Sequence, residues 1–242
     1  MIMVAGLVLV GLFGLVVWQL MSLWLFVVPS PLATLRAIGF VHNQGNFGGA
    51  AAATFVNAVA SFIAAVVVGA ALGVALGRSD YWYRVFEPLI IVGGAIPKII
   101  IYPSLLLLVG LGARSIISMG FIGGIFAVLI NVMVAVRTMN PIYGRVARSL
   151  AMSPWRAAWR IYLPAVSLPF ITGVRLSFGL VVVNVIFGEL FAAKAGIGKL
   201  ALHFYGQAQY AAMMVVIMIL FLFGTAGSLL LWAVERHLKK YF

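Results

Sequence analysis

Residues 54–77 read TFVNAVASFIAAVVVGAALGVALG, a stretch without a charged side chain and with Thr54, Asn57 and Ser61 as its only polar ones. The stretch stops at Arg78, where charged residues return. A helix needs about 20 mostly apolar residues to cross the hydrocarbon core of a bilayer, and this stretch is long enough. It therefore predicts a helix that spans a membrane.

The composition of the whole chain agrees with this prediction. Of 242 residues, 65% are hydrophobic and 8% are charged, whereas an average soluble domain has roughly 45–50% apolar and about 25% charged residues. The apolar stretches extend along the whole sequence and leave no polar block large enough for a separate globular domain. We therefore expect residues 1–242 to form a single transmembrane domain. The absence of cysteine excludes disulfides and cysteine-based metal sites.

Six apolar stretches of this kind occur. The first could be a cleaved signal peptide, but such a peptide begins with basic residues, and the first charged side chain here is Arg36. We therefore expect the first stretch to be retained. The third stretch contains Pro97 and Pro103, each of which removes a backbone donor and bends or interrupts a helix. Such breaks persist in lipid only where protein or a water-filled cavity satisfies the freed carbonyls, so the third helix is expected to face inward. The sequence predicts an all-α integral membrane protein with six transmembrane helices, at about residues 4–28, 54–77, 88–112, 115–136, 165–193 and 211–234.

Basic residues in the loops predict the orientation. A long polar insert, residues 137–164, separates the fourth and fifth stretches, and six helices place it on the same side as both termini. Ten basic residues fall on that side: Arg78, Arg84, Arg137, Arg145, Arg148, Arg156, Arg160, Arg236, Lys239 and Lys240. Four fall on the other: Arg36, Arg114, Lys194 and Lys199. Because cytoplasmic loops carry the excess of Lys and Arg, we expect a multi-pass inner-membrane protein with cytoplasmic termini, and we attribute the net charge of +12 to this bias rather than to nucleic-acid binding.

The insert carries the most informative motif. Residues 145–164 read RVARSLAMSPWRAAWRIYLP. Ser153 followed by Pro154 is typical of a helix start, with serine as the N-cap and proline at the first helical position. The insert is thus expected to form two short helices around a turn, with aromatic and aliphatic residues among the arginines. Such a surface suits contact with another protein or with lipid headgroups.

This insert resembles the cytoplasmic coupling loop of binding-protein-dependent ABC importer permeases (type I importers), whose pattern is EAA-x3-G-x9-I-x-L-P. The matching residues are Ala147, Ile161, Leu163 and Pro164. Arg145, Val146 and Ala151 stand where the family has Glu, Ala and Gly. The resemblance is closest to the nitrate/sulfonate/taurine branch and extends over most of the chain. Further segments that support it are PSP at 29–31, Thr54, EP at 87–88, IPK at 96–98, GLG at 110–112, Asn131, GVRL at 173–176, GE at 188–189 and AGIG at 195–198.

The resemblance implies a set of partners. Two permease chains would form the pathway, as a homodimer or a heterodimer, and a periplasmic or lipid-anchored binding protein would deliver the solute. Two cytoplasmic ATPase subunits would bind ATP and magnesium, since this chain lacks the G-x-x-x-x-G-K-[ST] phosphate-binding motif and holds no cofactor of its own. The residues implied to contact the ATPase are Arg145, Ala147, Arg148, Ala151, Met152, Ser153, Pro154, Trp155, Leu163 and Pro164.

Charged side chains within the spans are costly and are therefore functional candidates. Lys98, beside the break at Pro97, could attract an anionic solute, or could be held by backbone carbonyls or reach the membrane interface. Arg175 and Glu189 are roughly 21 Å apart along one helix and cannot pair. Arg175 could be a structural tie near the cytoplasmic side, and Glu189 could cap a loop or contribute to an outer gate. The candidate residues of the translocation pathway are Pro97, Lys98, Asn131, Arg175 and Glu189.

Glycines recur every four residues at Gly69, Gly73 and Gly77, and again at Gly120 and Gly124. In lipid, such stripes let helix backbones approach closely. We expect packing within the chain, with pairing of two permease chains as the alternative.

The function expected from these features is the permease subunit of an ABC importer, with a small anion such as a sulfonate or nitrate as the solute. The alternative is a stand-alone channel or ion-coupled carrier, although no internal repeat or midplane carboxylate supports it. An enzyme is not expected, because His42, His203 and His237 lie in separate segments and no G-x-S-x-G motif occurs. Metal binding is not expected either.

Overall fold

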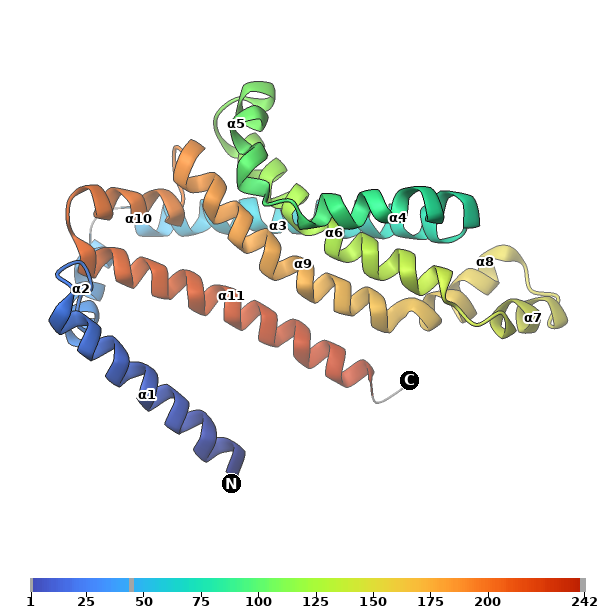
Figure 1. Cartoon of the computed structure of the whole chain (residues 1–242), viewed down its shortest axis with the longest axis horizontal. Coiled ribbons are helices and arrows are strands. Elements are labelled where there is room, and N and C mark those ends of the chain that lie inside the picture. The colour runs from blue at the N-terminus through green and yellow to red at the C-terminus, as the bar shows by residue number, and fades with distance from the viewer. Residues whose placement is uncertain (1, 44–45, 240–242) are drawn as a thin grey trace. The chain divides into compact units, whose positions relative to one another are not determined.

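All regular elements in the described part of the chain are helices. The computed structural model describes residues 2–43 and 46–239. The helices are α1 Ile2–Trp24, α2 Pro31–Asn43, α3 Phe47–Gly77, α4 Asp80–Ala95, α5 Lys98–Val109, α6 Ala113–Arg137, α7 Ile142–Ser149, α8 Pro154–Ala157, α9 Leu163–Ala192, α10 Ile197–Gly206 and α11 Tyr210–Leu238, with a π-helical segment, η1, at Ala158–Tyr162 (Figure 1). Lys240, counted above among the cytoplasmic basic residues, lies outside the described residues.

The helices belong to two compact units. The first unit comprises residues 1–54 and 194–223, and the second comprises residues 55–193 and 224–242. In the first unit, the ring of Phe40 on α2 lies 6.3 Å from that of Phe204 on α10. The backbone N–H of Ile197 donates to Thr54 Oγ1 at 2.8 Å and so ties the start of α10 to α3. Neither α2 nor α10 was expected from the hydropathy of the sequence.

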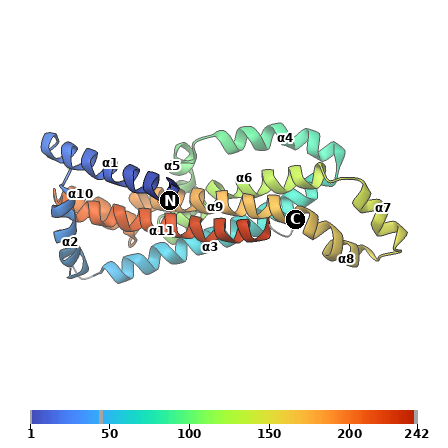
Figure 2. The same ribbon diagram turned by 90° about the horizontal axis from the view of Figure 1, so that it is seen from below.

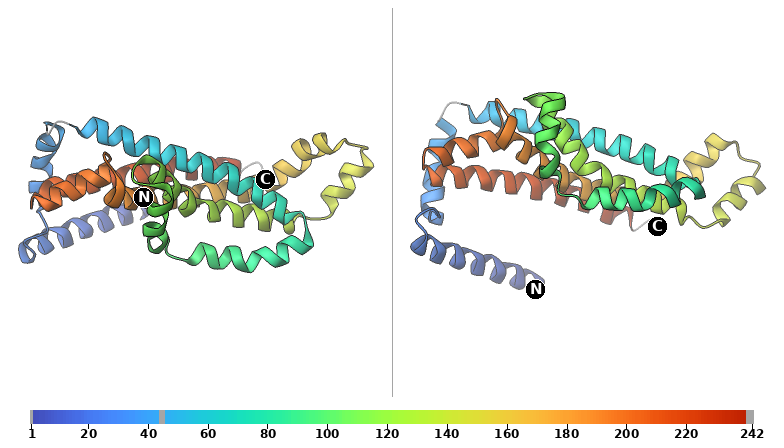
Figure 3. Two further views of the ribbon diagram at one scale, coloured as in Figure 1. Left: turned by 90° about the horizontal axis from the view of Figure 1, so that it is seen from above. Right: turned by 45° about the horizontal axis from the view of Figure 1, so that its top comes forward.

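The core of the second unit is the contact between α6 and α9, which run alongside each other (Figure 1 and Figure 3). Small residues on α6 make this contact close. A Cβ atom added at Gly124 would lie 2.4 Å from Val181 Cγ2, and one added at Gly123 would lie 2.4 Å from Asn184 Nδ2. These distances are too short for any real side chain. The two backbones therefore approach as closely as they do because residues 123 and 124 have no side chain.

The glycine stripe of α3 also faces α6. A Cβ atom at Gly73 would lie 2.8 Å from Val132 Cβ, and one at Gly77 would lie 2.6 Å from the carbonyl oxygen of Met133. At Gly69 the nearest atoms are the carbonyl oxygen of Ile125 and Val128 Cβ, both at 3.0 Å. The stripe therefore packs within the chain, and its surface is occupied by α6 rather than left open for a second chain.

The third apolar stretch is interrupted at Pro97. Helices α4 and α5 are bent by 94° at this break, and Ile96 and Pro97 between them have extended backbone conformations. The predicted break at Pro97 is thus present. Pro103 differs from the expectation, because it lies inside α5 without ending it. The missing N–H of Pro103 removes only the one helical hydrogen bond that would reach back to Ile99.

Four helical segments of the described residues are long and apolar enough to cross a membrane: α3, α6, the segment Pro154–Ala192 and α11. The bent pair of α4 and α5 adds a fifth if it counts as one span. In the first stretch, α1 covers Ile2–Trp24 rather than about residues 4–28, and it is not among the segments counted here as spans. By length and composition the structure thus supports four or five spans, and the count of six stays a prediction.

Candidate functional site

The insert folds as two short helices that project beyond the ends of α6 and α9 (Figure 2). Helix α7 covers Ile142–Ser149, and α8 begins at Pro154, where the sequence predicted a helix start. Ser153 caps α8, since its Oγ accepts a hydrogen bond from the backbone N–H of Arg156 at 3.4 Å. Through η1, α8 continues into α9 without a loop. A movement of α8 would therefore pass directly to a transmembrane helix.

The turn between α7 and α8 has an alanine in a left-handed conformation. Ala151 has φ +48°. Its backbone N–H donates to the carbonyl of Arg148, and the N–H of Met152 donates to that of Ala147, both at 3.0 Å. This pair of hydrogen bonds defines a Schellman motif, whose left-handed position is usually glycine. The turn that the family pattern ends with glycine is thus formed here by alanine, at the cost of backbone strain.

We expect Ala151→Gly to stabilise the protein by about 0.5–1 kcal/mol, because relief of the left-handed strain exceeds the extra unfolded-state entropy of glycine. The measurement is thermal unfolding of the purified chain in detergent, where the midpoint should rise by roughly 1–4 °C.

The control is Ala208→Gly, in the first unit. Ala208 has φ +56°, and the hydrogen bonds from Ala208 to Tyr205 and from Gln209 to Phe204 form the same motif after α10. Both variants should raise the midpoint. A lower midpoint for Ala151→Gly alone would contradict the assignment of strain to this turn.

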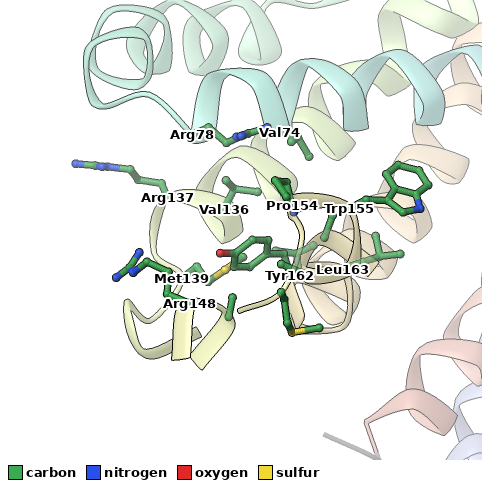
Figure 4. A pocket seen from close by; sticks show the side chains of 16 residues that line it. Val74, Arg78, Val136, Arg137, Met139, Arg148, Pro154, Trp155, Tyr162 and Leu163 are labelled. Carbon is green, nitrogen blue, oxygen red and sulfur yellow. The ribbon is translucent and has the colours of Figure 1, made fainter. Parts of the chain in front are cut away.

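A hollow of about 900 Å³ lies between the insert and the adjoining ends of α3 and α6. In Figure 4, the Tyr162 ring reaches into the middle of the lining residues, while the Trp155 indole extends away from it. The lining residues are Val74, Gly77, Arg78, Val136, Arg137, Met139, Ala147, Arg148, Met152, Pro154, Trp155, Ala157, Ala158, Tyr162, Leu163 and Val166.

Eight of the ten residues implied to contact an ATPase lie on α7, on α8 or in the turn between them, and Leu163 and Pro164 begin α9. Ala147 is buried, at 5% exposure, and so is Ala157 on α8, at 4%. Met152 and Pro164 are half-buried. The exposed members are Arg145, Arg148, Ala151, Ser153, Pro154, Trp155 and Leu163. Trp155 is the most prominent, with 71% of its surface exposed and its ring 5.5 Å from that of Trp159.

The candidate pathway residues do not form one cluster. Lys98 Nζ donates to three backbone carbonyls, those of Gly93, Gly94 and Ile96. Asn131 Nδ2 donates to the carbonyl of Ala127 on its own helix, at 2.8 Å. A pathway role for these residues stays a prediction.

Arg175 has a partner that the sequence interpretation missed. Its Nε lies 2.7 Å from Glu235 Oε2. Thr172 Oγ1 donates to Glu235 Oε1 at 3.0 Å, and Lys239 Nζ lies 3.0 Å from the same oxygen. Glu235 is 3% exposed, so this carboxylate ties α9 to the end of α11. The signal available in the sequence was that Glu235 is one of only four acidic residues in the chain.

Glu189 is fully buried, at 0% exposure, in the last turn of α9. Asn57 Nδ2 on α3 donates to Glu189 Oε1 at 3.5 Å. One residue earlier, the carbonyl of Gly188 accepts a hydrogen bond from the Tyr102 hydroxyl on α5, at 3.0 Å. The end of α9 is thus linked by polar groups to α3 and α5.

A second ionic cluster joins the insert side of α4 and α6. Asp80 accepts from Arg137 and also pairs with Arg84, whose Nε lies 3.1 Å away. Among residues 2–43 and 46–239, no three His, Cys, Asp or Glu side chains lie close enough together to hold a metal ion.

The apolar spans, the broken helix and the projecting insert define a polytopic membrane protein of the transport permease class. The chain belongs to the family of binding-protein-dependent transport system inner membrane components, which it matches over residues 65–240. The sequence resemblance to these importer permeases is thereby confirmed.

Named relatives and a solved structure are consistent with this family. The chain is 31% identical over 195 residues to the nitrate import permease protein NrtB of Synechocystis sp., across 76% of this chain and 70% of that protein. It is 26% identical over 147 residues to the taurine transport system permease protein TauC of Escherichia coli, across 61% of this chain and 54% of that protein. A chain in an inward-facing structure of the MetNI methionine ABC transporter superposes with a TM-score of 0.66 at 17% identity, over 84% of this chain and 98% of that one. At this identity the structural likeness shows the fold alone.

Proposed function

We propose that the whole chain, residues 1–242, is one permease domain of an ATP-driven importer and that the insert, residues 137–164, transmits the work of a separate ATPase. The observation that carries this proposal is the geometry of the insert. Its two alanines, Ala147 and Ala157, are buried, while Trp155 is 71% exposed at the start of a helix that continues into α9. The insert is thus joined to a transmembrane helix at one end and presents an exposed aromatic side chain to a partner.

The partners follow from the same proposal. Two cytoplasmic ATPase subunits, which bind ATP and magnesium, would contact the exposed residues of the insert. A second permease chain would complete the pathway, and a binding protein outside the membrane would deliver the solute. The distribution of basic residues fits six spans with both termini in the cytoplasm. This orientation places the insert on the same side as the ATPase.

The second permease chain is either a copy of this one or a related chain. Arg145 is exposed on α7, at the position where the family pattern has glutamate, so the charge presented to an ATPase is reversed here. A heterodimer, in which the other permease retains the usual loop, would explain this difference. The intact mass of the purified complex distinguishes the two arrangements, since a single permease mass would eliminate the heterodimer.

The solute we propose is a small anion of the nitrate or sulfonate class. The support is the likeness to relatives named for nitrate and taurine. Asn131, Arg175 and Glu189 remain the polar residues proposed to influence the pathway. Arg175 would act by its ion pair with Glu235 at the end of α11. Glu189 would act by its hydrogen bond from Asn57 at the end of α9.

Uptake into right-side-out membrane vesicles tests this function. Vesicles from cells that make the chain and its ATPase are loaded with ATP or with ADP, mixed with the proteins released from the cell envelope, and given labelled nitrate or taurine. We expect uptake only with internal ATP, and none in vesicles from cells that lack the gene. Uptake of equal size with ADP would instead indicate an ion-coupled carrier or channel.

A further inference from the structure

The break between α4 and α5 leaves carbonyl groups that need donors. In a continuous helix the carbonyl of residue 93 would accept from the N–H of residue 97, but Pro97 has none. The backbone N–H of Lys98 belongs to the first turn of α5 and points along a helix bent by 94° from α4. The last carbonyls of α4 are therefore left without helical partners, at the end of the helix that carries partial negative charge.

The Lys98 ammonium supplies the hydrogen-bond donors that the backbone lacks at the end of α4. Its Nζ lies 2.6 Å from the carbonyl oxygen of Gly93, 3.1 Å from that of Gly94 and 2.7 Å from that of Ile96. An ammonium group has three N–H donors, so each of these carbonyls can receive one. The positive charge also lies at the C-terminal end of α4, where it is favourable.

An aromatic ring completes the surroundings of the ammonium. Lys98 Nζ lies 4.8 Å from the centre of the Phe126 ring on α6, within the range of a cation–π interaction. The ring reaches this position because residue 93 has no side chain, since a Cβ atom at Gly93 would lie 3.1 Å from Phe126 Cε1. Three carbonyls and one aromatic face thus form a cage that fits a primary ammonium ion.

We propose that Lys98 is a positioning residue that holds the broken span in its bent form, and that the cage left when its side chain is deleted binds a primary alkylammonium ion. With its three donors directed at backbone carbonyls, the ammonium has no N–H left for an anionic solute. Lys98 therefore acts on transport by fixing the geometry of α4, α5 and α6, and not by contact with the solute.

The test is chemical rescue of Lys98→Ala in the full chain purified in detergent. Alanine keeps Cβ, so propylammonium replaces the deleted atoms Cγ to Nζ. We expect the unfolding midpoint to fall by roughly 4–10 °C, because three charge-assisted hydrogen bonds are lost, and to recover by at least half in about 100 mM propylammonium. Tetramethylammonium at the same concentration, which has no N–H donor, should restore nothing.

The matched control is Lys199→Ala, which removes an exposed lysine on α10 and should leave the midpoint unchanged with or without propylammonium. Recovery of Lys98→Ala with both cations, or with neither, overturns the proposal. An unchanged midpoint together with a higher solute concentration for half-maximal uptake also overturns it, because that result places Lys98 against the solute.

A double-mutant cycle keeps the proposal testable if Lys98→Ala is recovered in too small an amount. Pro97→Ala restores an N–H that reaches the Gly93 carbonyl once Ile96, which is extended in the native chain, becomes helical. The loss caused by Lys98→Ala or Lys98→Met should therefore be smaller in the Pro97→Ala background than in the native chain. Equal losses in both backgrounds would show that the lysine does not replace the missing donor. The readout is unfolding and does not require transport, so its failure is distinguishable from failure of the proposed function.

Discussion

Replacement of Trp155 by alanine is expected to abolish ATP-driven uptake. The indole is 71% exposed at the start of α8 and stacks edge-on against Trp159, at 5.5 Å between ring centres. A large aromatic side chain presented in this way is typical of the few residues that dominate a protein interface. Its removal should weaken binding of the ATPase by roughly 30-fold or more, since such residues contribute about 2 kcal/mol or more.

The measurement is titration of the purified permease with its ATPase, followed by uptake into vesicles. The unfolding midpoint of Trp155→Ala should change little, because most of the indole contacts solvent. Trp24→Ala is the matched control, since Trp24 is 87% exposed at the end of α1 and lies outside the insert. If Trp155→Ala binds the ATPase and transports within twofold of the native chain, the insert is not the coupling element.

Gly124→Ala is expected to have the largest effect on stability. The new Cβ would lie 2.4 Å from Val181 Cγ2 and 2.7 Å from Ser177 Oγ on α9. Neither α6 nor α9 can move away without opening the main contact of the second unit. We expect a destabilisation of roughly 3 kcal/mol, at the upper end of the usual cost of overpacking, and a fall in the unfolding midpoint of roughly 6–12 °C.

The same substitution on the facing helix provides the control. A Cβ atom at Gly179 of α9 meets nothing within 4 Å. Gly179→Ala should therefore be neutral, or stabilising by up to about 1 kcal/mol through the higher helix propensity of alanine. Thermal unfolding and the yield of membrane-inserted protein compare the two variants. Equal midpoints would mean that α6 and α9 are not as close as the structure has them.

Hydropathy predicted the long helices because the preference of a segment for lipid is the sum over its own side chains. This sum is a local property and can be read from the sequence. The stretches at 54–77, 115–136 and 211–234 lie within α3, α6 and α11. Helices α2 and α10 were missed because they are short, and their stability comes from contacts such as that of Phe40 with Phe204, which hydropathy does not measure.

The insert was predicted in more detail than any other segment. The N-cap at Ser153 and the helix start at Pro154 depend on neighbours within one turn, so the sequence contains all the information they need. The left-handed conformation of Ala151 could not be predicted from alanine itself, which disfavours it. Only the hydrogen bonds of the turn, together with the packing of Ala147, hold the residue there.

For the polar residues of the spans, the sequence predicted less than it did for the insert. The sequence identified Lys98, Arg175 and Glu189 as unusual, because charges are rare in apolar stretches. It did not identify Glu235 as the partner of Arg175, since the two lie on different helices whose relative rotation no local pattern specifies. It also left open whether Lys98 faces a solute or its own backbone.

The stretch at 54–77 illustrates which features of the protein follow from its sequence and which depend on its tertiary structure. Its composition alone determined that it forms a membrane-spanning helix, since its apolar side chains favour lipid and a helix satisfies the backbone hydrogen bonds within the segment. Which way its glycines face was decided by the tertiary structure, where Val132 and Met133 of α6 fill the space that Gly73 and Gly77 leave. Close packing between helices depends on the shapes of both surfaces at once, and one helix by itself contains only half of that information.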